Sequence, residues 1–75
     1  MLTETEIKEW INQVIEKMRA IKADSESDLY GQPKKDNYMI RASMMKDSLV
    51  LLDEAAVLYK VLEEKIPKEV FDLTP

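Results

Sequence analysis

The fold of this chain is decided by one stretch, YMIRASMMKDSLVLLDEAAVLYKVLEEKI, which spans residues 38–66 and contains no Gly and no Pro. Such a stretch predicts one long helix, in which successive side chains turn by about 100° around the axis. The apolar residues then cover about half of the circumference, whereas a helix packed on one neighbour needs a stripe of only about 100°. We therefore expect this helix to have two neighbours. The apolar arc consists of Tyr38, Ile40, Met44, Met45, Leu49, Leu51, Leu52, Ala55, Ala56, Leu58, Tyr59, Leu62 and Ile66.

A first helix is predicted at the start of the chain. Thr3 is a good N-cap, and Glu6, three residues later, completes a capping box with it. Apolar residues then recur at intervals of three and four from Ile7 to Ile21, which is typical of an amphipathic helix. This pattern indicates a helix that begins at about residue 4 and packs one face on a neighbour.

The end of the first helix has two interpretations. Gly31 followed by Pro33 is the usual stop signal, and it places the end near Tyr30. Residues 24–28 are poor helix formers, which would instead end the helix at Ala23. Because an end near Tyr30 matches the lengths of the two helices better, we expect helix 1 over residues 4–30 and a connection over residues 31–36.

Helix 2 is predicted to run over residues 37–66, with Asp36 or Asn37 as its N-cap. Pro67 would end it, because the residue before a proline disfavours the α conformation. The tail, residues 67–75, has the composition for one short turn of helix that begins with Pro67. The sequence leaves open whether this tail folds back on the two helices.

Together these elements predict an all-α fold, an antiparallel two-helix hairpin that forms a single domain over residues 1–75. A core of this size rarely stabilises a fold by more than about 3–5 kcal/mol without further support. The chain contains no Cys and no His, so disulfides and the usual zinc ligands are missing. We therefore expect support from a second copy, in a homodimer that forms a four-helix bundle.

The expected dimer contact follows a spacing of three and four along helix 2, which suits a helix–helix seam. Another side of helix 2 carries apolar residues at nearly one angle among charged neighbours, and we interpret it as a surface for a different protein. The alternative is that this stripe packs on Trp10 or on the second subunit. The self-association residues are Ala42, Met45, Leu49, Leu52, Ala56 and Tyr59. The residues expected to face helix 1 are Leu51, Ala55, Leu58 and Leu62, and the sequence also allows these two sets to exchange roles. The partner surface is Met39, Val50, Val57 and Val61.

Composition argues against several classes of function. The net charge of −4, from 15 acidic and 11 basic residues, does not suit binding to nucleic acid. No uncharged run approaches the length of about 20 residues that spans a bilayer, and charged residues interrupt any signal-peptide pattern. We expect a cytoplasmic protein that binds neither nucleic acid nor membranes.

The sequence lacks the residues that most enzymes use for catalysis. It has no His as a general base and no Cys as a nucleophile, and its single Gly cannot form a glycine-rich phosphate loop. Asp47 and Glu54 share one face two turns apart, which allows a carboxylate-metal hydrolase as a remote alternative. Those two lie among lysines, and only Glu63 approaches the apolar arc. We expect no enzyme activity, no cofactor and no metal.

Two short polar motifs have functional interpretations that we rank below solvated structure. Lys34 and Lys35, with Arg41 and Lys46, form a small basic cluster that suits a phosphate or an acidic partner. The segment from Ser25 to Asp28 resembles an acidic-directed phosphorylation site.

The sequence therefore predicts a small non-enzymatic protein that acts through protein–protein interaction as a homo-oligomer, as a regulator, adaptor or inhibitor. The main alternative is a structural subunit that docks its apolar helix face on a different protein.

Overall fold

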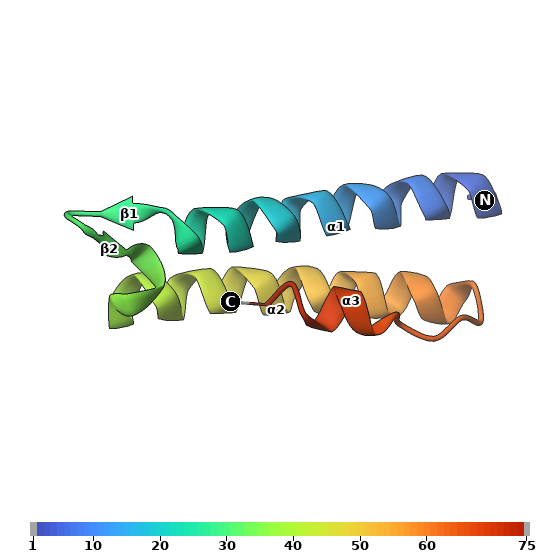
Figure 1. Cartoon of the computed structure of the whole chain (residues 1–75). Coiled ribbons are helices and arrows are strands. Elements are labelled where there is room, and N and C mark those ends of the chain that lie inside the picture. The colour runs from blue at the N-terminus through green and yellow to red at the C-terminus, as the bar shows by residue number, and fades with distance from the viewer. Residues whose placement is uncertain (1, 75) are drawn as a thin grey trace.

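The computed structural model describes residues 2–74, and two long antiparallel helices dominate it (Figure 1). The molecule is elongated, with principal extents of 47 × 19 × 15 Å. The predicted all-α hairpin is confirmed, with a small two-stranded sheet added at the connection. The elements are α1 (Glu4–Glu26), β1 (Asp28–Leu29), β2 (Gln32–Pro33), the 3-10 helix η1 (Lys34–Asp36), α2 (Tyr38–Val61) and α3 (Lys68–Phe71).

The start of α1 is the predicted capping box. The Glu6 amide donates to the Thr3 hydroxyl at 3.2 Å, and the Thr3 amide donates to the Glu6 carboxylate at 3.3 Å. Two backbone donors that have no partner within the helix are thereby satisfied, as this motif requires.

The end of α1 lies at Glu26, between the two ends considered from the sequence. Ser27 is extended at the C-cap, and the chain then enters the β1–β2 hairpin, in which Leu29 pairs with Gln32. The two residues between them, Tyr30 and Gly31, have positive φ values of 54° and 85°. A two-residue hairpin turn of type I′ needs positive φ at both positions. The glycine is therefore a hairpin residue, and the predicted helical end near Tyr30 is corrected to Glu26.

Both ends of α2 are set by local hydrogen bonds. The Asn37 side chain accepts from the amides of Met39 and Ile40, which makes Asn37 the N-cap. At the other end the amide of Glu64 donates to the Tyr59 carbonyl and the amide of Glu63 to that of Lys60.

This pair of bonds is a Schellman motif, with Glu63 in the left-handed position at φ 58°. The helix therefore stops at Val61, before the predicted end at Ile66, and Pro67 is not the residue that ends it. A glycine usually occupies the left-handed position, and because Glu63 stands there instead, no sequence signal marks this stop.

The tail folds back along α2 (Figure 1). Pro67 is the N-cap of α3 rather than its first residue, and Val70 within α3 is buried in the core. The Lys22 ammonium of α1 donates to the Asp72 carbonyl at 2.6 Å, which ties the tail to the first helix as well. Over part of its length α2 therefore has a second neighbour within its own chain.

One core joins the three helices. Leu51 and Leu62 pack against it and Ala55 and Leu58 belong to it, as expected for the residues of helix 2 that face helix 1. The buried apolar residues are Ile7, Ile11, Val14, Met18, Ala55, Leu58, Tyr59 and Val70.

Two small residues, Ser48 and Ala55, lie two turns apart on the buried side of α2, and both are 0% exposed. Ala55 belongs to the same core as Met18 and Val14 of α1. Small residues on the buried side of a helix let a close-packed core accept larger side chains from its neighbour. Among the described residues, 2–74, the Ser48 hydroxyl finds no hydrogen-bond partner. A buried hydroxyl without a partner destabilises a fold by about 1–3 kcal/mol.

We predict that Ser48→Ala raises the free energy of unfolding by about 1–2 kcal/mol, because it removes the unpaired hydroxyl and keeps the small volume. Urea unfolding followed by circular dichroism measures this change. The control is Ser43→Ala, an exposed serine of the same helix, which changes helix propensity by less than about 0.5 kcal/mol. A less stable Ser48→Ala protein would show that the hydroxyl is needed in the core.

Candidate interaction surface

The residues predicted to mediate self-association fall into an exposed part and a covered part. Ala42 and Leu49 are exposed, the latter with 47% of its surface accessible, and Met45, Leu52 and Ala56 are half-buried. Tyr59 is only 9% exposed and belongs to the core of its own chain. We define the α2 seam as Ala42, Met45, Leu49, Leu52 and Ala56, without Tyr59.

The folded-back tail explains why Tyr59 is covered. Ile66 and Leu73 pack against the core that contains Tyr59, and Phe71 lines one depression together with Ala56. The N-terminal part of the seam has no such cover. There Tyr38, which is 83% exposed, lines a second depression with Ala42 and Met45.

Sequence reasoning missed two aromatic residues of this surface. Tyr38 belongs to the apolar arc by its angle but was not assigned to the seam, and Phe71 lies in a tail whose position the sequence left open. Phe71 is half-exposed in the folded-back tail. Their position beside Ala42 and Ala56 extends the apolar surface beyond both ends of the seam.

The predicted partner surface is exposed over its whole length. Met39, Val50, Val57 and Val61 each have more than half of their surface accessible, and we call this set the valine face. Neighbouring residues of α2 on its rim include Lys46 and Lys60, which are exposed as well. Exposed apolar residues are ordinary when they are scattered, but these four share one side of one helix.

Trp10 joins α1 to α2 through a polar contact. Its indole N–H donates to the Glu54 carboxylate at 2.7 Å, while the ring is 41% exposed. Glu54 was one of the carboxylates considered for a metal site, and its bond to Trp10 gives it a structural role between the helices.

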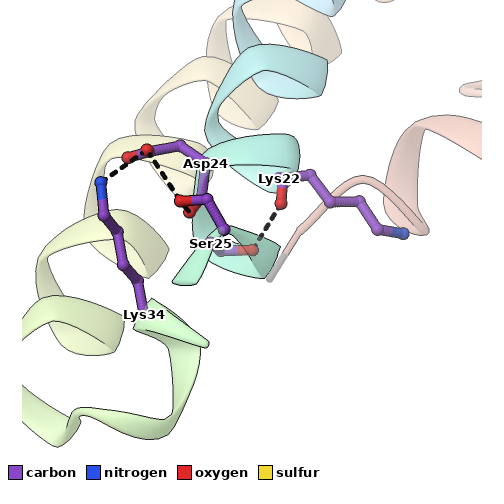
Figure 2. Close-up of polar contacts among 5 residues, drawn as sticks. Lys22, Asp24, Ser25 and Lys34 are labelled. Atoms are coloured by element: carbon purple, nitrogen blue, oxygen red, sulfur yellow. Dashed lines mark hydrogen bonds and ion pairs between the residues drawn. The ribbon is translucent and has the colours of Figure 1, made fainter. Parts of the chain in front are cut away.

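The connection end of the hairpin is held by short polar contacts (Figure 2). The Lys34 ammonium lies 2.8 Å from the Asp24 carboxylate, and the Ser25 hydroxyl donates to the Lys22 carbonyl at 2.6 Å. The hydrogen bond from Lys34 is the main cause that lowers the pKa of Asp24 below its ordinary value. Lys34, a member of the predicted basic cluster, is thus paired within the chain.

The same contacts bear on the predicted phosphorylation motif. Ser25 is 1% exposed and bonded to its own helix, so a kinase cannot reach it in the folded chain. The Ser27 hydroxyl donates to the Asp24 carbonyl at 2.6 Å, which makes it part of the cap of α1.

Within residues 2–74 no group of three or more Asp or Glu side chains is placed to hold a metal ion. Asp47 and Glu63, the other carboxylates considered for a hydrolase, are exposed on α2 and just beyond it. No helix in this part of the chain is long and apolar enough to cross a membrane.

Comparison with protein-family models, with curated proteins and with solved structures gives no match to this chain. Its function is therefore argued from its own surface.

Tyr59, in the covered part of the surface, makes the stability of the fold depend on pH. Burial, with a smaller effect of the Glu64 and Glu69 carboxylates, raises the pKa of its phenol above the ordinary value of 10.0. The neutral phenol is thus favoured in the folded chain. Its contribution to stability is complete below pH 10 and is lost as the pH rises through the pKa of the folded state.

We predict that the free energy of unfolding of the wild type falls more steeply between pH 9 and pH 11 than that of Tyr59→Phe, which cannot ionise. Urea unfolding at several pH values measures both slopes. Parallel slopes would show that Tyr59 is not held in a buried site.

Proposed function

We propose that this chain is a non-enzymatic protein-interaction module that self-associates through the α2 seam and binds a different protein through the valine face. It would act as a regulator, adaptor or inhibitor. The observation that carries this proposal is the distribution of apolar side chains on α2. Leu49 and Val50 are neighbours in sequence, lie on different sides of the helix, and are 47% and 59% exposed.

Self-association is supported by the small size of the core. Over residues 2–74 only eight apolar residues are buried in the core, and the sequence contains no cysteine that could form a disulfide. A domain of this size commonly gains stability from a second subunit. Two hairpins joined along the α2 seam would form a four-helix bundle and cover Leu49 and Tyr38, which one chain leaves in water.

The valine face is supported as a second surface because it lies away from the seam. A row of small apolar side chains with charged neighbours fits recognition of a helix by an apolar groove. Binding there would leave the seam free, so one assembly could hold a second copy and a different protein at the same time.

The same exposed seam supports a second candidate function, a structural subunit of a hetero-complex. In that case Leu49 and Tyr38 would be covered by a different protein, and the isolated chain would have no partner. The mass of the purified chain separates the two functions.

We predict a mass of twice 8.7 kDa for the wild type at micromolar concentration. Leu49→Lys should weaken association by about 2–3 kcal/mol, because it places a charge in the seam. The matched control is Val50→Lys, a change of similar kind at a neighbouring and similarly exposed position outside the seam. Light scattering after size exclusion measures all three proteins.

A stable wild-type monomer would contradict self-association and favour the hetero-complex. A dimer that Leu49→Lys and Val50→Lys weaken equally would show that the seam is not the contact.

A second prediction concerns the valine face. The double variant Val50→Lys, Val57→Lys should keep its fold and mass but lose the proteins that the wild type captures from its native host. The control is Lys17→Ala, a change on the exposed side of α1. Capture of the same proteins by the double variant would exclude this face as the binding site.

A further inference from the structure

We propose that the second copy lies antiparallel along the α2 seam, with the two-fold axis between Leu49 and Leu52 and with ion pairs between Lys46 and Asp53 of opposite copies. This inference rests on the self-association proposed above and specifies its direction and register. Neither residue has an ion-pair partner within the chain over residues 2–74. Both are exposed.

The seam has the spacing of a coiled-coil contact. Ala42, Leu49 and Ala56 lie seven residues apart, and Met45 and Leu52 lie between them at intervals of three and four. In an antiparallel pair each residue of one series meets a residue of the other series. Leu49 then meets Leu52 of the second copy, and Met45 meets Ala56.

This register places a large side chain against a small one. Ala56 lies in the depression that Ile66 and Phe71 also line. Met45 of the second copy would enter that depression, and the exposed ring of Phe71 would contact it. The apolar tail thus becomes part of the dimer contact instead of obstructing it.

Charge complementarity selects the same register. Lys46 precedes Leu49 by three residues, Asp53 follows it by four, and both lie on the same edge of the seam. A two-fold axis between Leu49 and Leu52 brings Lys46 beside the second copy's Asp53, and the symmetry repeats the pair on the other side. Opposite charges on matching edges fix direction and partner choice in helix pairs.

A parallel arrangement of the two copies is disfavoured by the residues on the other edge of the seam, the edge that carries Arg41, Ser48 and Ala55 and not Lys46 and Asp53. In parallel pairs a residue on that edge meets the residue five positions later in the other helix. Arg41 would then lie beside Lys46 of the second copy, which places like charges together. The following positions on that edge, Ser48 and Ala55, are fully buried in their own chain and cannot meet a second copy.

The test is a charge-reversal cycle with Lys46→Asp, Asp53→Lys and the double variant. Sedimentation equilibrium gives the dimer dissociation constant of each. We expect each single reversal to raise that constant about tenfold or more, because it turns two attractive pairs into two repulsive ones. The double reversal should return it to within about threefold of the wild type. Circular dichroism confirms that all variants keep their helices.

The two single variants control each other for net charge. Lys46→Asp makes the chain more negative and Asp53→Lys makes it less negative, so an effect of overall charge would move the two constants in opposite directions. A wild-type dimer that neither reversal weakens, or that the double reversal does not restore, would overturn this register while leaving self-association intact. A monomeric wild type would overturn both proposals.

Discussion

The whole structure depends on the close packing of α1 against α2 at two small residues. Ser48 and Ala55 are completely buried, and Ala55 shares one core with Met18 and other side chains of α1. A larger residue at either position would force the helices apart and expose the core. The cost of this arrangement is the unpaired Ser48 hydroxyl.

The contact also decides which surface remains exposed. With α1 on one side of α2 and the tail beside it, the apolar arc of α2 is covered around Tyr59 but open around Leu49 and Tyr38. The tail reaches the core through Val70 and is anchored to α1 by the Lys22–Asp72 bond. The open part of the arc is the surface for which we propose a second copy.

Periodicity and capping residues were sufficient to predict the two helices and their antiparallel packing, but they left open which part of the apolar arc of α2 faces α1. The missed boundaries share one physical cause. Tyr30 and Glu63 adopt left-handed backbone conformations that glycine usually occupies, so Gly31 was assigned to a helix end and the stop after Val61 was not foreseen. The position of the tail depends on tertiary packing of Val70, which no local pattern in residues 67–75 reveals.

The most direct test of the account is a nuclear Overhauser experiment on a mixed sample of isotope-labelled and unlabelled chains. Filtered spectra report only contacts between different copies. The account predicts contacts from the Leu49 methyl groups to Leu52 of another copy, and from Met45 to Phe71. Spectra that show Leu49 in contact only with its own chain and with water would contradict the claim that a second copy covers the open part of α2.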